Sequence, residues 1–345
     1  MTYDLQVLGF GALAIDDIIY VDRPLSAGKG KVTNRASDHG GNVATALVAV
    51  AKLGGRAGFI GWLSDLPPNE PSARELERHG VDISFAPRRA DARPIRSVIT
   101  VGSDGGRFIA YDDDVPHGTS DTLADDTLAQ AQVLLVDGYA THADMIVARA
   151  RKLGLAVLAD IEWSIGPATE RLMGLSDHLV LPFGFAQTYT GENDATAILG
   201  KLWSDNRSAV VLTDGDRGAY IRQKDDAVLW HVPAFKVRAV DTTGAGDCFH
   251  GAYAFALTEG KSPVACAIFA TAAAAISVTG RGGRMALPDH SACLSWMARE
   301  DAPVPMPLVS SGGEFMSAKV SIDAGSSRQS GSIDADSSIV KVEVV

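Results

Sequence analysis

The chain has 345 residues, of which 46% are apolar and 21% charged, and its formal net charge is −11. A chain of this length can bury a large core, as one α/β domain or as two smaller domains. The acidic balance argues against a broad nucleic-acid or anionic-membrane surface, because such surfaces rely on clustered Lys and Arg.

The three cysteines, Cys248, Cys266 and Cys293, are widely spaced and form no CxxC pair. Neither a disulfide framework nor a zinc site is therefore indicated. The N-terminus lacks a basic segment, and no apolar run approaches the roughly 20 residues that span a bilayer. We expect a cytoplasmic protein.

Short apolar runs that end in small or polar residues are typical of buried parallel strands. In chain order they are 5–12, 133–140, 155–161, 178–183 and 209–215. Helical patterns at 42–55, 145–154 and 193–205 lie between them. The alternation predicts a mostly parallel sheet with helices on both faces, whose ligands bind outside the carboxyl ends of the strands.

Two segments interrupt this alternation. Residues 17–37 and 93–111 have the pattern of antiparallel strands, the second with an SDGG turn. We predict that they form a small β-strand lid on a domain spanning residues 1–300. The Ser-, Gly- and Asp-rich composition of residues 301–345 predicts a partly disordered C-terminal tail, whose last residues could pair as a strand.

Two nucleotide-binding motifs are matched only in part. GFGALA (9–14) fits the dinucleotide fingerprint, but the IDDIIYVDRP that follows suits a strand better than a phosphate-binding helix. EGKSP (259–263) resembles the end of a P-loop, but Phe255 stands where that motif needs Gly. We predict neither site.

Gly40, Gly41 and Asn42 stand at the start of a long amphipathic helical pattern. They could simply begin and cap that helix. Alternatively, the glycines let a polar ligand lie against the backbone while the Asn42 amide binds hydroxyl groups. The residues alone leave both interpretations open.

The most specific motif is DTTGAGDCFHG, residues 241–251. The apolar spacing after it predicts a helix that begins near Gly246 or Asp247. Small residues before that point, Gly244 and Ala245, would let an anion reach the free N–H groups of the helix. Asp247 could be a helix cap, but a cap does not need these small residues. The arrangement suits phosphoryl transfer, in which an acidic residue accepts the proton of the attacking hydroxyl.

Two further glycine-containing turns are less specific. Thr213, Gly215 and Gly218 lie at the end of a strand and in the turn after it, where a simple hairpin is an equal explanation. The loop 277–288 is rich in glycine, which suits a backbone that folds around a planar base but also suits any loop.

Two of these motifs, in this order, resemble the signatures of the ribokinase-like (PfkB) carbohydrate kinases. Residues 40–65 resemble the first signature and residues 241–257 the second, within a similarity that covers residues 5–290. The resemblance implies a three-layer α/β sandwich with a mostly parallel sheet and a β lid. It also implies ATP-dependent phosphorylation of a sugar hydroxyl, with Mg²⁺. We further expect a homodimer formed through the lid, a small-molecule sugar substrate, and no nucleic-acid or membrane partner.

The resemblance also implies roles for single residues. Asp247 would be the catalytic base, and Gly244, Ala245 and Gly246 would form the anion hole with it. The sugar would be held by Asp16, Gly40, Gly41 and Asn42; ATP by Thr213, Gly215, Gly218, Thr271 and Gly282; and a monovalent cation such as potassium by Asp241 and Thr243.

One departure concerns the metal. The family commonly carries Asn-x-x-Glu before a helix that ends in Thr-Gly, and here that motif is replaced by Pro182-Phe183-Gly184-Phe185. Magnesium could still bridge the ATP phosphates, because Mg²⁺ keeps several water ligands. The departure motivates one alternative, a sugar- or nucleotide-binding regulator without turnover. A nucleoside kinase of the same fold is the other alternative.

The whole chain is most similar to the ketose-phosphorylating members: fructokinase-like, ketohexokinase-like and sulfofructose kinases. A sulfonate would need a basic partner, and Lys29, Lys31, Arg35 and Arg96 in the predicted lid are candidates. However, Asp137-Gly138-Tyr139 stands where the arginine of the sulfofructose kinases is expected. This favours an uncharged or differently charged sugar, and we expect a ketose of the fructose type.

Overall fold

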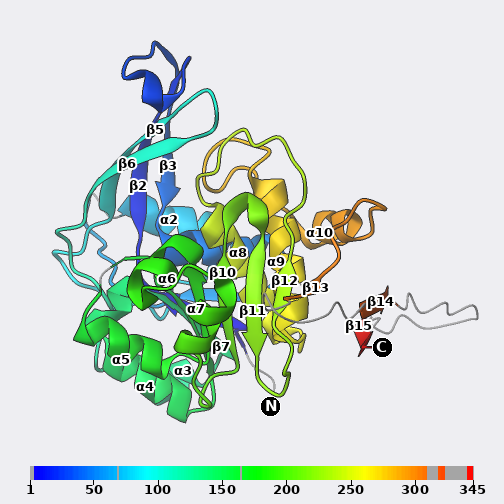
Figure 1. Ribbon diagram of the computed structural model, residues 1–345. Coiled ribbons are helices and arrows are strands. Elements are labelled where there is room, and N and C mark those ends of the chain that lie inside the picture. Colours follow the sequence, from blue (N-terminus) through cyan, green and yellow to red (C-terminus); the bar gives the residue numbers. More distant parts are fainter. Residues whose placement is uncertain (1–3, 68–69, 164, 309–317, 323–339, 345) are drawn as a thin grey trace, which may run out of the picture.

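The computed structural model describes residues 4–67, 70–163, 165–308, 318–322 and 340–344. A nine-stranded sheet carries helices on both faces, and a separate four-stranded sheet rises beside it (Figure 1). This architecture is the predicted three-layer α/β sandwich with a small β lid.

Six parallel strands form the main part of the large sheet, in the order β10-β9-β8-β7-β1-β4. They are β1 (Val7–Phe10), β4 (Ala57–Phe59), β7 (Val133–Asp137), β8 (Ala156–Asp160), β9 (His178–Pro182) and β10 (Ala209–Thr213). The antiparallel strands β11 (Ala219–Gln223), β12 (Trp230–Val232) and β13 (Met306–Pro307) extend one edge. Every residue of β1 and β7 is buried, which explains their continuous apolar sequences.

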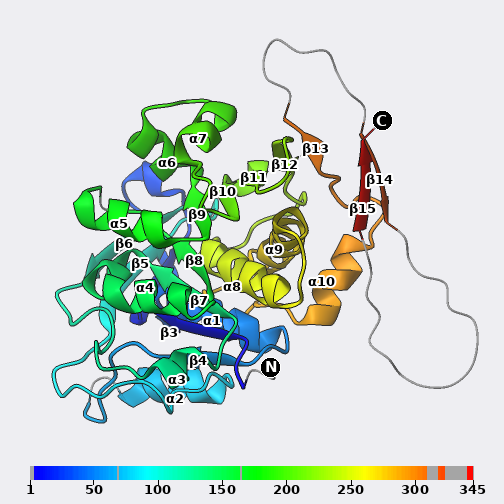
Figure 2. The same ribbon diagram turned by 90° about the horizontal axis from the view of Figure 1, so that it is seen from below.

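Helices cover both faces of this sheet, as the two orientations in Figures 1 and 2 show. One face carries α1 (Asn42–Lys52), α2 (Glu70–Arg78), α8 (Ala245–Thr258), α9 (Pro263–Ser277) and α10 (His290–Met297). The other carries α3 (Asp125–Leu128), α4 (Asp144–Lys152), α5 (Pro167–Leu175), α6 (Phe183–Thr190) and α7 (Ala195–Leu202). Three short 3₁₀ helices, η1 (Leu25–Ala27), η2 (Gly138–His142) and η3 (Gly215–Arg217), lie in connections.

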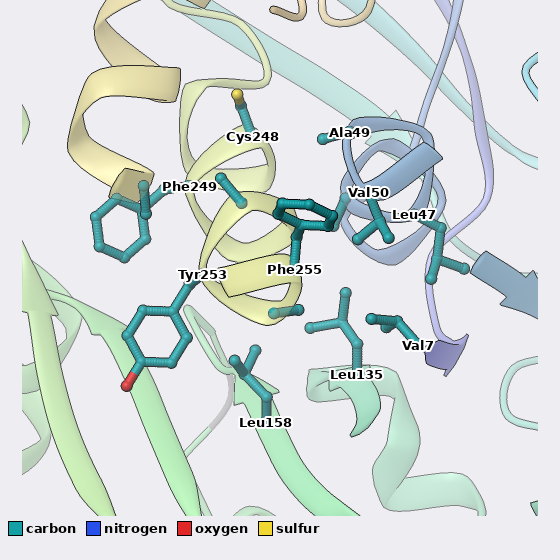
Figure 3. Packing of buried hydrophobic residues seen from close by; sticks show 14 of the residues in the cluster. Val7, Leu47, Ala49, Val50, Leu135, Leu158, Cys248, Phe249, Tyr253 and Phe255 are labelled. Carbon is teal, nitrogen blue, oxygen red and sulfur yellow. The ribbon is translucent and has the colours of Figure 1, made fainter. Parts of the chain in front are cut away.

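A hydrophobic core between α1, α8 and the sheet fixes where these two helices begin (Figure 3). Val50 of α1 and Phe255 of α8 belong to one buried cluster with Val7, Leu135 and Leu158 of the strands. Burying a side chain of this size contributes about 1.5–3 kcal/mol. This packing holds α1 and α8 against each other, so that the first residues of both helices lie beside the carboxyl end of β8.

The lid consists of β2 (Ala14–Val21), β3 (Val32–Gly40), β5 (Ile95–Val101) and β6 (Arg107–Asp112), in the order β3-β2-β5-β6. These strands occupy the two segments that interrupt the sequence pattern, and the β5–β6 turn falls at the predicted SDGG. Ile18, Tyr20, Ile99 and Val101 form a small core on one face of the lid. Because β2 follows β1 after only three residues, the lid is joined directly to the large sheet.

Beyond residue 308, the strands β14 (Ala318–Ile322) and β15 (Val340–Val344) form an antiparallel pair. The rest of that part of the predicted tail, residues 309–317, 323–339 and 345, lies outside the described residues. No helix within the described ranges combines the length and the apolar character that crossing a membrane requires.

Candidate active site

The start of α8 presents free backbone donors. Gly244 caps the helix with a φ of 73°. The N–H groups of Gly244, Gly246 and Asp247 donate to no residue in the described part of the chain, whereas Ala245 N donates to Thr242 O at 3.3 Å. The structure changes the membership of the predicted anion hole. The free amides of Gly244, Gly246 and Asp247 can donate to an anion, whereas the amide of Ala245 is already bonded.

Asp247 stands half-buried in the first turn of this helix. Burial raises the pKa of its carboxyl well above the ordinary value, and the negative charges of Asp160 and Glu162 raise it further, while Arg107 and Arg284 oppose this. A carboxylate with a raised pKa, once ionised, is a stronger proton acceptor. The position and the pKa both suit a general base.

The carboxyl end of β8 brings two acids to this helix start. Asn42 Nδ2 donates to Asp160 Oδ2 at 3.1 Å and to Glu162 Oε1 at 2.9 Å. Asp160 is buried, and its Oδ1 has no hydrogen-bond donor within the described residues, with His250 Nε2 3.5 Å away. Because both amide hydrogens of Asn42 go to carboxylates, Asn42 offers a ligand only its oxygen, as an acceptor.

The carboxyl end of β9 is apolar, as its sequence shows. Pro182 ends the strand and α6 begins at Phe183. The Phe183 ring lies 5.7 Å from that of Tyr220, and Phe183 and Phe185 both pack against the core on the α4 and α7 face. Residues 182–185, the PFGF segment, therefore offer no side chain that could bind a metal ion.

The structure brings together Asp16, Gly40, Gly41 and Asn42. Asp16 is buried on β2, where Ser97 Oγ of β5 donates to its Oδ1. A Cβ atom on Gly40 would lie 2.0 Å from Asp16 Oδ2, so only glycine allows this approach. Burial raises the pKa of Asp16, while the Ser97 hydrogen bond and Arg284 lower it. Gly41 then caps α1, which begins at Asn42.

Lys29 and Arg96, also predicted to bind substrate, do not join this group. Lys29 is exposed in the connection between the far ends of β2 and β3. Arg96 precedes Ser97 on β5, and because neighbouring residues of a strand point to opposite faces, it lies on the other face from Ser97 and Asp16. Arg96 therefore does not face the site that contains Asp16.

The residues predicted to bind ATP fall in two places. Thr213 ends β10 beside Pro182, and Gly215 and Gly218, both with positive φ, form the turn after it. Thr271 is buried on α9, and its hydroxyl has no partner among the described residues. Gly282, in contrast, donates its N–H to Asp241 Oδ2 at 3.0 Å, so it contacts the loop before α8.

Asp241 and Thr243, the predicted ligands of a monovalent cation, lie in the loop before α8. Asp241 Oδ2 accepts from Tyr20 Oη at 2.9 Å as well as from Gly282 N, and Oδ1 accepts from Thr243 N at 2.9 Å. Burial alone would raise the pKa of Asp241, but these hydrogen bonds hold it below its ordinary value. Protein donors thus engage both carboxylate oxygens, the Thr243 hydroxyl has no hydrogen-bond partner in the described part of the chain, and the cation site stays a prediction.

Three residues of the site were missed by the sequence analysis: Asp160, Glu162 and Arg107. Arg107 follows the β5–β6 turn, and its Nη1 donates to Thr242 O at 2.9 Å and Thr242 Oγ1 at 2.7 Å. Burial and neighbouring carboxylates raise the pKa of Asp247 and of Glu162, and the positive charge of Arg107 opposes both shifts. For the two acids a signal existed, because they end a predicted parallel strand, where ligands bind.

The chain matches the model of the pfkB family carbohydrate kinases over residues 4–290. This match covers most of the sequence, and the chain belongs to the PfkB family of carbohydrate kinases. Members of this family are ATP-dependent phosphotransferases, so the predicted enzyme class is confirmed.

Individual relatives agree with this assignment. Fructokinase-1 from Zea mays is 27% identical over 319 residues, which cover 84% of this chain and 96% of that protein. A ribokinase from Haemophilus influenzae is 25% identical over 317 residues, which cover 86% and 99%. Among solved structures, ribokinase from Thermotoga maritima superposes with a TM-score of 0.70 at 26% identity, covering 86% of this chain and 100% of that one.

Proposed function

We propose that this chain transfers the γ-phosphate of ATP to a hydroxyl group of a small ketose of the fructose type, with Asp247 as the base. The observation that carries this proposal is the position of Asp247 beside the free amides of Gly244 and Gly246. The similarity to Fructokinase-1 from Zea mays supports the choice of sugar.

In the proposed reaction, Asp16 and the side-chain oxygen of Asn42 hold the sugar by its hydroxyl groups. The attacking hydroxyl loses its proton to Asp247 as its oxygen bonds to the γ-phosphorus in line with the departing ADP oxygen. The free amides at the start of α8 then stabilise the charge on the transferred group. Such preorganised donors need no rearrangement during the reaction, which is why they lower the barrier.

Magnesium would be held by Asp160 and Glu162. Both side chains offer the carboxylate oxygens that Mg²⁺ prefers, and Asp160 Oδ1 is buried without a donor in the described structure. When bound with ATP, the ion supplies positive charge that offsets the charge of the phosphates. The described residues contain no group of three or more metal-binding side chains, which agrees with an ion that also takes phosphate and water oxygens.

Arg107 would add a second positive charge from the lid. Its guanidinium already reaches across to Thr242, directly before the anion hole. Because Asp160, Glu162 and Asp247 repel phosphate groups, a second cation at this point favours ATP binding.

A panel assay tests this function. ADP release is measured with purified protein, ATP and Mg²⁺ over D-fructose, D-ribose, other aldoses, sugar acids, sulfosugars and nucleosides. We expect the largest kcat/KM with a neutral ketose. Turnover of nucleosides alone would establish the nucleoside kinase instead. Ligand-induced thermal shifts without ADP release would establish a regulator.

We also propose a homodimer formed through the lid. Several of the exposed large apolar side chains lie on lid strands: Val32, Val98, Phe108, Ile109 and Tyr111. Phe108 is 65% exposed, which is unusual for a side chain of its size. Light scattering should give about 72 kDa for a dimer of 36.2 kDa chains, and Phe108→Ser should shift the mass toward the monomer. A monomeric wild-type protein would contradict this proposal.

A further inference from the structure

The segment Arg281–Arg284, which we call the RGGR segment, contacts the lid, the loop before α8 and the start of α8. Arg281 lies over the Tyr20 ring of the lid, with 5.1 Å between its guanidinium carbon and the ring centroid. Gly282 N donates to Asp241, and the Gly283 backbone packs so closely on Gly244 that a Cβ there would lie 2.7 Å from Gly283 O. The segment therefore supports the anion hole directly.

Arg284 extends from this segment to the sugar-binding residues. It is only 2% exposed, and its Nη2 donates to Gly40 O at 2.7 Å while its Nε donates to Thr45 Oγ1 at 3.1 Å. Gly40 is the residue that lies against the Asp16 carboxylate. Thr45 is buried in the first turns of α1, three residues after Asn42. One side chain thus holds the backbone and the helix that carry the predicted sugar ligands.

The charge of Arg284 is balanced inside the protein. Burial lowers its pKa to about 10, and the carboxylates of Asp38, Glu75 and Asp16 oppose that shift. The side chain is therefore cationic near neutral pH. Its Nη1 is buried and has no partner within the described residues, so Nε and Nη2 make its two fixed contacts. A guanidinium presents donors on separate nitrogen atoms in a fixed planar fork, whereas the three donors of an ammonium group share one nitrogen atom, which cannot stand in the places of both Nε and Nη2.

We infer that Arg284 is a positioning residue that couples the sugar-binding residues to the anion hole, so that a bound sugar raises the affinity for nucleotide. This inference rests on the proposed function. Sugar binding restrains the positions of Asp16 and Gly40. Because Arg284 is bonded to Gly40, this restraint extends to Gly282 and Gly283, and through them to Gly244 at the anion hole. Because such coupling is reciprocal, nucleotide raises the affinity for sugar by the same factor.

Titration calorimetry with the full chain measures this coupling. The dissociation constant of the Mg²⁺ complex of AMP-PCP, a non-hydrolysable ATP analogue, is determined alone and with saturating D-fructose. In the wild type we expect D-fructose to tighten nucleotide binding about tenfold. In Arg284→Lys this ratio should fall below about twofold, because the charge remains but the fixed fork that holds Gly40 O and Thr45 Oγ1 in place is lost. Nucleotide affinity without sugar should stay within about threefold of the wild type.

Two further variants make the test specific. Arg299→Lys changes an exposed arginine paired with Asp301, and it should keep the wild-type ratio. Thr45→Val removes only the acceptor of Nε, and it should lower the ratio while keeping the charge of Arg284. If Arg284→Lys does not fold, the Thr45→Val variant alone tests the inference.

The outcomes separate two failures. A wild-type ratio in folded Arg284→Lys, or in Thr45→Val if Arg284→Lys does not fold, would overturn the inference. So would a wild-type protein that binds both ligands with a ratio near one. If the wild type binds no sugar of the panel, the proposed function fails, and the inference falls with it.

Discussion

The carboxyl ends of two neighbouring strands, β8 and β9, differ sharply in chemistry. β8 ends in Asp160 and is followed by Glu162, both held by the Asn42 amide. β9 ends in Pro182, and Phe183 and Phe185 are half-buried against the core. The acids nearest Asp247 therefore stand at the end of β8, whereas the family resemblance places an Asn-x-x-Glu motif at the end of the neighbouring strand β9.

Under the proposed function, the carboxylates that approach the phosphates come from β8 and not from β9. Both strand ends lie at the same edge of a parallel sheet, near the start of α8. A carboxylate on either strand can approach the same bound phosphates, because ligands in such sheets bind across neighbouring strand ends. The loss of polar residues from β9 is thus compatible with a working kinase.

The largest effect is expected for Asp247→Asn. The amide cannot accept the hydroxyl proton, so kcat should fall by about 10²–10⁴-fold while the dissociation constant of the sugar stays within about threefold. Steady-state ADP release and calorimetry measure the two quantities. Asp289→Asn is the matched control, because Asp289 is a simple helix cap whose side chain accepts from Ala292 N at 2.8 Å. Near-normal turnover by Asp247→Asn would refute the assignment of the base.

The next largest effect should come from the end of β8. Glu162→Gln removes a charge but keeps the size of the side chain, and we expect it to weaken Mn²⁺ binding in the presence of AMP-PCP by about 10–100-fold. Electron paramagnetic resonance of free Mn²⁺ gives this affinity without relying on turnover. Glu170→Gln, on the exposed side of α5, should leave it unchanged. Unchanged Mn²⁺ affinity in Glu162→Gln would remove Glu162 from the metal site.

Local sequence signals were sufficient for the strands and for the start of α8. Buried parallel strands are continuous apolar runs, and all five predicted runs contain strands of the sheet, as at Val133–Asp137. The contacts of Arg107 and Arg284 could not be predicted in this way. Arg107 meets a residue 135 positions away, and Arg284 meets one 244 positions away, so the fold alone brings them together.

The sequence was misleading where charge alone suggested a role. Lys29 and Arg96 were candidates because they are basic and belong to the lid, but the alternation of β5 turns Arg96 away from Asp16. For Asp241 the family resemblance implies a cation ligand, and this stays a prediction. The structure uses its carboxylate to join Tyr20 of the lid to Gly282. The direction of the Arg96 side chain thus decides that it does not reach Asp16.

The opposite end of β9 gives a pH-dependent test of stability. His178 is buried beside Tyr253, with 3.0 Å between Nδ1 and Oη, and burial lowers its pKa to about 4. The unfolded chain therefore binds more protons below about pH 6.5, and stability should fall as the pH drops. From pH 7.5 to 5.0 this group should cost about 2 kcal/mol in urea unfolding, a loss that is absent in His178→Gln. Identical pH profiles would contradict a neutral buried His178.

The smallest effect is expected at the apolar end of β9 itself. Phe185→Leu keeps an apolar side chain in the contact with Tyr189, whose ring lies 6.1 Å away, so stability should change by less than about 1.5 kcal/mol. If the metal is held from β8, kcat and Mn²⁺ affinity should stay within about threefold of the wild type. Together with a loss of Mn²⁺ affinity in Glu162→Gln, this result would assign metal binding to the end of β8. A tenfold loss of kcat in Phe185→Leu at an unchanged melting temperature would instead show that the β9 end takes part in the reaction.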